Sequence, residues 1–145
     1  MGWGTFYEVQ PTAGWELSAC TTKAEWYGVL SRLSIESAPQ LSAEESIPFW
    51  ASKLHSVGHP TANFFEGDLH AARDEYDDPN VCFAGPDLVR FFLVQLEQLG
   101  RQFFVDLFAH DGPSGSGQSW LYEPLRDFLR PLCERGNAVV ILWEN

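Results

Sequence analysis

The stretch that most constrains this sequence lies near its end, where Ala138 to Trp143 reads AVVILW. Six apolar residues in succession, three of them β-branched, favour an extended strand. A strand without a polar side is typical of the middle of a sheet that is covered by helices. The stretch therefore predicts a central strand, and the rest of the chain must supply its neighbours and its cover.

Helical periodicity predicts the cover. Residues 22–25 (TKAE) and 42–45 (SAEE) are capping boxes, and each precedes apolar residues at helical spacing. Pro48 delays or kinks the second of these helices, and Gly58 ends it. Helices are expected at about 23–34, from the second capping box to Gly58, at 86–99 and at 120–134. Strands are expected at Thr5–Val9, Val81–Ala84, Phe103–Phe108 and Ala138–Trp143, with a turn at Pro11–Gly14 and irregular chain over 59–80.

This order of elements predicts the α+β class, with α/β as the alternative: a small mixed sheet covered by about four helices. The length suits one domain, and neither an internal repeat nor a linker divides residues 1–145. The six tryptophans and eleven phenylalanines support a substantial core.

The charge balance limits the classes of partner. Twenty acidic residues against nine basic ones give a net charge of −11. Such a field repels nucleic acid and anionic membrane surfaces, because both are bound through lysine and arginine. It attracts a basic protein and speeds their encounter. Solubility alone is the other explanation of the charge, and the sequence leaves both open.

The sequence points to the cytoplasm. Cys20, Cys82 and Cys133 are odd in number and far apart, unlike a disulfide framework or a zinc cluster. The first residues, MGWGTFYEVQ, have neither the basic flank nor the apolar stretch of a signal peptide. No apolar run reaches the ~18 residues of a membrane span.

Residues 112–119 read GPSGSGQS and differ by one letter from the nucleotide-binding pattern G-x-x-x-x-G-K-[ST]. The predicted context, between a strand and a helix, is the required one, and the string resembles the loop of ATP-binding cassette ATPases. However, Gln118 stands where the lysine would contact phosphate, and only 26 residues follow Ser119. We interpret the stretch as a connector, with a nucleotide site as the alternative.

Histidines offer two further candidates. His55 and His59 are four residues apart, as zinc ligands on one helix face would be, but surface histidines explain them as well. His110 and Asp111 precede the 112–119 loop and suggest a hydrolase, although no G-x-S-x-G elbow accompanies them. No metal site and no cofactor are expected.

The segment 66–78 (EGDLHAARDEYDD) carries six carboxylates against one arginine. Aromatic residues among carboxylates are typical of an interface in which rings anchor a partner and charges steer it. A solvated acidic loop is the alternative. The expected partner-binding residues are Phe65, Glu66, Asp68, Asp74, Glu75, Tyr76, Asp77 and Asp78.

Residues 85–99 (GPDLVRFFLVQLEQL) and 122–143 (YEPLRDFLRPLCERGNAVVILW) resemble the closing half of the small YfbM-like bacterial proteins. The first two residues, MG, and residues 49–55 (FWASKLH) are further echoes. That family has no assigned activity, so the resemblance implies a bacterial domain of helices around a sheet and no mechanism.

In size, charge and composition, the chain is also similar to the immunity proteins of interbacterial toxins. That likeness implies a protein which covers a basic toxin with an acidic, aromatic surface. We therefore expect an immunity protein that neutralises a cognate toxin by direct binding and is more likely not an enzyme. The alternative is a small hydrolase with a site around His110, Asp111 and residues 112–119. The oligomeric state is left open.

Overall fold

The middle of the sheet is β5 (Ala138–Glu144), which lies between β1 (Trp3–Val9) and β4 (Asn80–Ala84). This arrangement comes from a computed structural model, which describes residues 3–71 and 80–144. The prediction that the most apolar stretch forms a central strand is confirmed, and so is the α+β class.

The sheet is antiparallel rather than mixed. β2 (Gln40–Ser42) flanks β1, β3 (Leu69–His70) flanks β4, and the order is β2-β1-β5-β4-β3 with every pairing antiparallel. The physical reason at β4 and β5 is that Ala84 pairs with Val139, so β5 starts at the sheet end where β4 stops. The helices between these strands must therefore bring the chain back to the same end.

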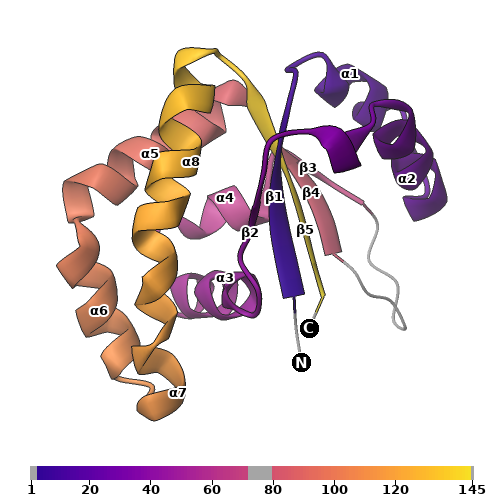
Figure 1. Ribbon diagram of the computed structural model, residues 1–145. Helices are drawn as coiled ribbons and strands as arrows, with labels where there is room; N and C mark the ends of the chain where they lie inside the picture. The colour runs from indigo at the N-terminus through magenta and orange to yellow at the C-terminus, as the bar shows by residue number, and fades with distance from the viewer. Residues whose placement is uncertain (1–2, 72–79, 145) are drawn as a thin grey trace.

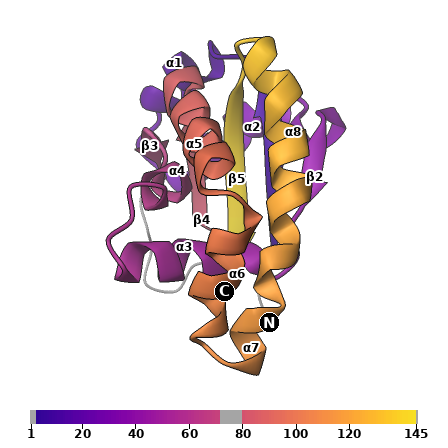
Figure 2. The ribbon, with the colours of Figure 1, turned by 90° about the vertical axis from the view of Figure 1, so that its left-hand side faces the viewer.

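Three helices make that return. α5 (Pro86–Leu99) and α6 (Arg101–Ala109) carry the chain away from the start of β5, and α8 (Tyr122–Glu134) runs back beside α5 (Figure 2). A parallel β4–β5 pair would have needed a single crossover helix instead.

Both faces of β5 are buried, which explains its composition. Val139, Ile141 and Trp143 point into one hydrophobic cluster, and Ala138 and Val140 point into a second cluster on the opposite face. Because side chains alternate along a strand, a strand covered on both faces has no position for a polar residue.

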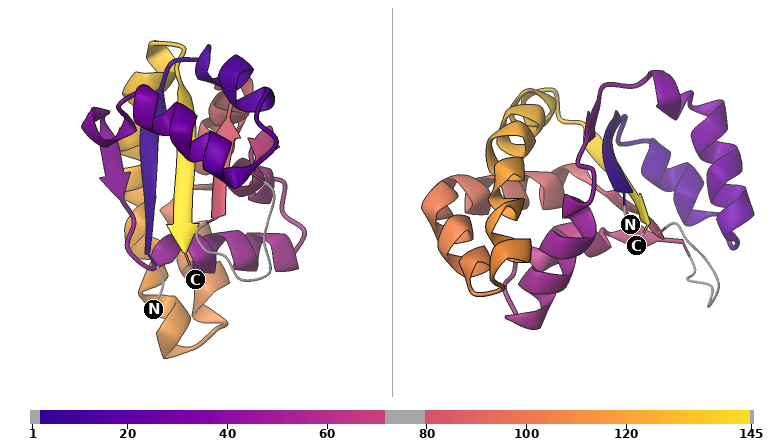
Figure 3. Two further views of the ribbon diagram at one scale, coloured as in Figure 1. Left: turned by 90° about the vertical axis from the view of Figure 1, so that its right-hand side faces the viewer. Right: turned by 60° about the horizontal axis from the view of Figure 1, so that its bottom comes forward.

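The cover is unequal on the two faces (Figure 1; Figure 3, left). It includes more than the four helices expected. One face carries α1 (Ala13–Ser18) and α2 (Lys23–Arg32); the other carries α3 (Ser46–Ser56), α4 (Ala62–Glu66), α5, α6 and α8. Short turns at η1 (Ile35–Ser37), α7 (Pro113–Ser116) and η2 (Gln118–Leu121) complete the elements. Within the described ranges, no helix combines the length and apolar character needed to cross a bilayer.

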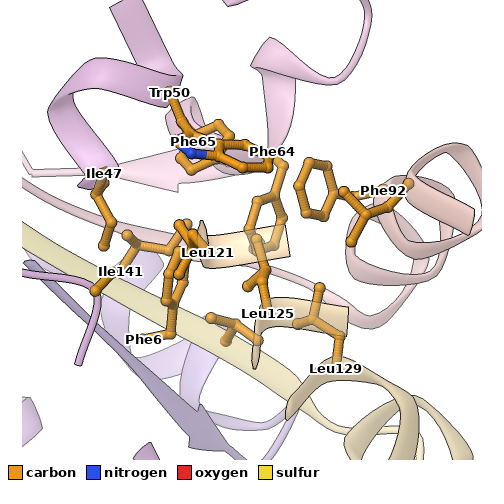
Figure 4. Packing of buried hydrophobic residues seen from close by; sticks show 14 of the residues in the cluster. Phe6, Ile47, Trp50, Phe64, Phe65, Phe92, Leu121, Leu125, Leu129 and Ile141 are labelled. Atoms are coloured by element: carbon orange, nitrogen blue, oxygen red, sulfur yellow. The ribbon is translucent and has the colours of Figure 1, made fainter. Parts of the chain in front are cut away.

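Aromatic rings fill the larger cluster (Figure 4). Phe64 stacks on Phe92 with ring centroids 4.1 Å apart, and Trp50 stacks on Phe104 at 4.7 Å. Phe6 of β1 lies 6.0 Å from Phe64, so the stack ties the sheet to α4 and α5. These contacts place five aromatic side chains in the packing of this cluster.

The predicted strand Phe103–Phe108 is wrong, because this stretch lies within α6. Phe104 and Phe108 are buried one helical turn apart, and Phe103 and Leu107 pack beside them. The same apolar residues thus fit a helical stripe as well as a strand. Gly100 has φ of 79° and lets the chain turn between α5 and α6.

The second capping box is also wrong. Ser42 belongs to β2, and α3 begins only at Ser46 without a side-chain cap. Pro48 then falls in the first turn, where its missing N–H costs no helical hydrogen bond. Gly58 follows α3 with φ of 69°, which confirms the predicted helix end.

Two short helices were missed, and one capping box is confirmed. Residues 11–14 lead into α1 rather than forming only a turn, and α4 lies inside the expected irregular stretch 59–80. Both helices are too short to show a period in the sequence. At α2 the hydroxyl of Thr22 accepts a hydrogen bond from the backbone N–H of Glu25 at 3.1 Å, as predicted.

The glycine-rich stretch 112–119 follows a helix, so the strand that a nucleotide-binding loop requires is not there. The side-chain oxygen of Gln118 accepts a hydrogen bond from Ser46 Oγ at 2.8 Å. The backbone carbonyl of Gln118 accepts a second one from Trp50 Nε1 at 2.8 Å. Ser46 Oγ in turn accepts from Trp120 Nε1 at 2.7 Å. The residue that replaces lysine therefore ties the 112–119 stretch to α3.

Close packing explains the glycine at position 115. A Cβ atom there would lie 2.4 Å from the carbonyl oxygen of Phe108 and 2.7 Å from Cβ of Asp111. At Gly117 the same added atom would meet nothing within 4 Å. The two glycines thus differ in what they tolerate.

We expect Gly115→Ala to lower the free energy of unfolding by about 1–3 kcal/mol, because the added methyl group overpacks against backbone. Gly117→Ala is the matched control and should keep or raise stability by up to about 1 kcal/mol. Urea denaturation monitored by circular dichroism compares them. Equal stability of the two variants would contradict the packing explanation.

A buried carboxylate joins β1 to the turn before β5. Glu8 is 7% exposed and accepts hydrogen bonds from Arg135 Nε at 2.9 Å, Arg135 Nη2 at 2.7 Å and Asn137 Nδ2 at 2.6 Å. The hydrogen bond from Arg135 is the main cause that lowers the pKa of Glu8, against the opposing effect of burial. Its charged form is thus stabilised in the folded state.

We expect Glu8→Gln to lower stability by about 1–3 kcal/mol near neutral pH, because a charged acceptor is lost. The pKa of Glu8 is lower in the folded than in the unfolded state. Its contribution is therefore complete above the ordinary glutamate range and is lost as the pH falls through the lowered value. The stability gap between wild type and variant should narrow between about pH 5 and about pH 3 in urea titrations. A constant gap would contradict the role of ionised Glu8.

Candidate functional site

The structure separates the residues that the sequence analysis expected to bind a partner. Phe65 is 1% exposed and packs in the larger cluster, so it has almost no surface to offer as an exposed anchor. Glu66 is exposed at the end of α4. Asp68 accepts a hydrogen bond from the backbone N–H of Gly85 at 2.6 Å and thereby holds the start of α5. The remaining residues, Asp74, Glu75, Tyr76, Asp77 and Asp78, lie outside the described part of the chain.

Phe65 and Glu66 nevertheless meet at one cavity, which we call the Glu66 cleft. Its volume is about 240 Å³. Four elements line it: α3 with Pro48, Ala51, Ser52 and His55, α4 with Ala62, Phe65 and Glu66, β4 with Asn80, and β5 with Trp143.

The helical repeat explains why α3 presents these residues together. Positions 48, 51, 52 and 55 are spaced by three and four residues and so share one face of the helix. Ile47, Trp50 and Leu54 share the opposite face and are fully buried. The burial of that face turns the first set towards the cleft.

The sheet supplies the other wall. Asn80 and Trp143 are direct cross-strand partners at one end of the β4–β5 pair. Trp3 and Glu144 pair at the same end, close to both chain termini (Figure 1). Trp3 is 38% exposed and donates a hydrogen bond from Nε1 to Glu144 Oε2 at 2.6 Å. An exposed indole beside a carboxylate thus adjoins this end of the sheet.

The cleft combines apolar walls with polar groups, among which Glu66 supplies the carboxylate. Phe65, Trp143 and Ala62 give apolar walls, while the carboxylate of Glu66 is about half exposed. Glu66 Oε1 lies 3.6 Å from His55 Nδ1, a distance too long for a hydrogen bond. Such a cleft suits a side chain with a long apolar stem and a cationic head.

The cleft lacks the contacts of nucleophilic catalysis. Ser52 and His55 both line it, but no hydrogen bond joins these two described residues. Burial raises the pKa of the Cys20 and Cys133 thiols, which disfavours the reactive thiolate at neutral pH. Cys20 and Cys133 are free thiols.

The hydrolase alternative loses its structural premise. His110 ends α6 rather than following a strand, and it is exposed. Asp111 Oδ2 lies 3.1 Å from Lys53 Nζ, so its carboxylate is engaged by α3. Ser119 is buried. A hydrolytic activity around His110, Asp111 and residues 112–119 stays a prediction.

His55 and His59, the candidate metal-binding pair, have different neighbours. His59 Nδ1 accepts a hydrogen bond from the backbone N–H of Thr61 at 3.2 Å and lies 2.7 Å from its hydroxyl. His55 faces Glu66 instead. Over residues 3–71 and 80–144, no three His, Cys, Asp or Glu side chains gather closely enough to hold a metal ion.

Comparison with known proteins identifies the fold and no activity. No protein-family model matches the chain, and no curated protein sequence matches it significantly. A crystal structure of YfbM from Escherichia coli, a protein of unknown function, superimposes with a TM-score of 0.66 over 98% of this chain and 99% of that one. The chain has a YfbM-like fold. Its identity to YfbM is 16%, so YfbM supports the fold alone. The predicted resemblance is confirmed at that level, and YfbM says nothing about immunity proteins.

Substitution of the two predicted partner-binding residues in the cleft should change the free energy of unfolding by different amounts. We expect Phe65→Ala to lower the free energy of unfolding by about 3–5 kcal/mol, because it opens a cavity among stacked rings. Glu66→Ala should change it by less than about 0.5 kcal/mol, as an exposed surface residue does. Chemical denaturation measures both. A large loss in Glu66→Ala would show that Glu66 has a structural role.

Proposed function

We propose that the protein binds and neutralises a basic protein partner, as the immunity proteins of bacterial toxins do. We further propose that the Glu66 cleft receives a lysine or arginine side chain of that partner. The observation that carries the proposal is the cleft itself, which places the exposed carboxylate of Glu66 beside the apolar side chains of Phe65 and Trp143.

The size of the cleft favours a protein contact over a substrate. Small-molecule sites generally have volumes of ~300–1,000 Å³. The Glu66 cleft, at about 240 Å³, is smaller and suits one inserted side chain. Central pockets that take one anchoring side chain are typical of protein interfaces.

The charge around the cleft has the negative sign that attraction of a basic partner requires. Among the described residues, no lysine or arginine lines it. The backbone N–H of Ala43 donates a hydrogen bond to the carbonyl of Gly4, and Gly4 is the cross-strand partner of Trp143. Glu44 and Glu45 follow Ala43 in the chain and therefore lie at the same end of the sheet as Glu144. An anionic rim of this kind steers a basic partner towards the cleft.

Most of the protein's own cations are already paired and do little to weaken this field. The ion pairs are Arg32 with Glu16, Lys53 with Asp111, Arg101 with Glu123, Arg126 with Asp127, Arg130 with Glu97 and Arg135 with Glu8. The net charge of −11 is therefore carried mainly by carboxylates outside these pairs.

The acidic stretch of the sequence adds to the proposal. Asp74, Glu75, Asp77 and Asp78 fall between Ala71 and Asn80, and Asn80 lines the cleft. Their contribution is proposed from the sequence alone: they would strengthen attraction at long range, and Tyr76 would add an aromatic contact.

The test is capture of the partner from the source organism's lysate by tagged protein, with matched charge variants. We expect wild type and Asp106→Lys to retain the same basic protein at about 50 mM salt, and Glu66→Lys to retain at least about tenfold less. Asp106 is exposed on α6, does not line the cleft, and its substitution makes the same change in net charge. Capture should weaken at about 500 mM salt, where charges are screened.

A second measurement tests neutralisation. The captured protein, once purified, should lose its own activity when one equivalent of wild type is added, and keep it when Glu66→Lys is added. Equal capture by Glu66→Lys and Asp106→Lys would falsify the role of the cleft. Undiminished activity of the partner in the complex would overturn the neutralising function.

A further inference from the structure

A second and larger cavity lies at the opposite end of the sheet from the Glu66 cleft. Its volume is about 610 Å³. It opens where β1 ends and β5 begins, between the α1 and η1 segments and the turn that follows α8. We call it the Glu8 cavity. Nothing in the proposed protein contact uses it, because the Glu66 cleft is lined by the far end of β5.

We propose that the Glu8 cavity binds a small, uncharged and mainly apolar molecule that presents one carbonyl or amide oxygen to Arg135. The volume falls inside the ~300–1,000 Å³ range of small-molecule sites. The proposal is independent of the partner proposed above.

The walls are mainly apolar. They include Val9, Ala13, Leu33, Ile35, Ala38 and Pro39. Leu33 is 38% exposed, although most of the protein's large apolar side chains are buried. A bound apolar group would remove part of this surface from water, which is favourable.

The polar part of the lining includes one group held in a fixed orientation, as in pockets that orient a ligand. Two of the five guanidinium N–H groups of Arg135 are used by Glu8, and this fork sets the plane of the guanidinium. The Arg135 side chain is 53% exposed, so its outer edge can donate to a ligand. An oriented donor loses little rotamer freedom when it binds an acceptor.

The charge of this cluster selects a neutral ligand. Glu8 and Arg135 pair one to one, so the cavity has no unbalanced charge of its own. An anionic ligand would approach against the protein's net charge of −11 and the adjacent carboxylate. A cationic ligand would approach the exposed guanidinium. An uncharged acceptor avoids both penalties.

The acceptors of Glu8 are largely occupied, which argues against a ligand that donates to it. Oε2 accepts from Arg135 and Asn137, and Oε1 accepts from Arg135. The backbone N–H of Glu8 donates to the carbonyl of Pro39 at 2.9 Å, which holds one wall against β1. Of the Glu8–Arg135 pair, Arg135 is therefore the member that has donors left for a ligand.

Three ligands with seven carbons each and different polar heads test the proposal: heptanamide, heptanoate and heptylamine. Each is titrated into ¹⁵N-labelled protein while amide chemical shifts are followed. We expect saturable shifts around Val9, Ala13 and Ile35 with heptanamide, and affinities at least about fivefold weaker for heptanoate and heptylamine.

Matched variants localise the binding. Ala38→Phe fills the cavity without removing a hydrogen-bonding side chain and should abolish the shifts, while Ser52→Phe alters the Glu66 cleft and should leave them unchanged. Arg135→Lys keeps the positive charge but removes the planar guanidinium with its fixed donors. It should weaken the affinity for heptanamide about five- to tenfold. If Ala38→Phe does not give a folded spectrum, Leu33→Asp at the exposed wall replaces it.

The proposal is overturned by any of four results. These are no saturable shift with heptanamide up to its solubility limit, equal or tighter binding of either charged analogue, undiminished binding by Ala38→Phe or Leu33→Asp, and undiminished binding by Arg135→Lys.

Discussion

The burial of β5 on both faces is the constraint on which the rest of the structure depends. Its alternate residues enter two separate hydrophobic clusters, so both faces must be covered and both edges must be paired. The small cover of α1 and α2 satisfies one face, and α3 to α8 supply the other. Loss of either layer would leave a row of apolar side chains in water, at a cost of about 25 cal/mol for each Å² exposed.

The same strand also separates two places of different character. At one end, Trp143 forms a wall of the small Glu66 cleft with its anionic rim. At the other end, the residues before Ala138 contribute Arg135 and Asn137 to a larger, mainly apolar cavity with a neutralised ion pair. One end is suited to a charged protein surface and the other to a small molecule. β5 runs between them, so the sheet fixes their relative position.

Much of the fold could be predicted from local patterns, and the errors have physical causes. β5, α2, α5 and α8 were predicted because their apolar spacing or end residues allow one interpretation. The apolar pattern of α6 fits a strand and a helix equally, and only packing on Phe49 and Trp50 decides for the helix. The Glu66 cleft itself was not predicted, although two of its lining residues, Phe65 and Glu66, were named as partner contacts. The α3 residues that line the cleft are spaced by three and four in the sequence, but this spacing does not show which face of the helix is turned towards the cleft. Glu8 and Arg135 are 127 residues apart, and no local signal joins them.

The pairing of β1 with β5 has a consequence for biosynthesis. Trp3 is the cross-strand partner of Glu144, so one edge of β1 stays unpaired until β5, the last described strand, has been made. As the chain leaves the ribosome, Phe6 and its neighbours have no central strand to pair with until residue 144 has emerged. Contacts of such long sequence separation form late and slowly, because loop-closure entropy is lost before they are gained. The sheet is therefore completed after translation of this region, and a chain that stops short of β5 would expose an apolar core to chaperones and proteases.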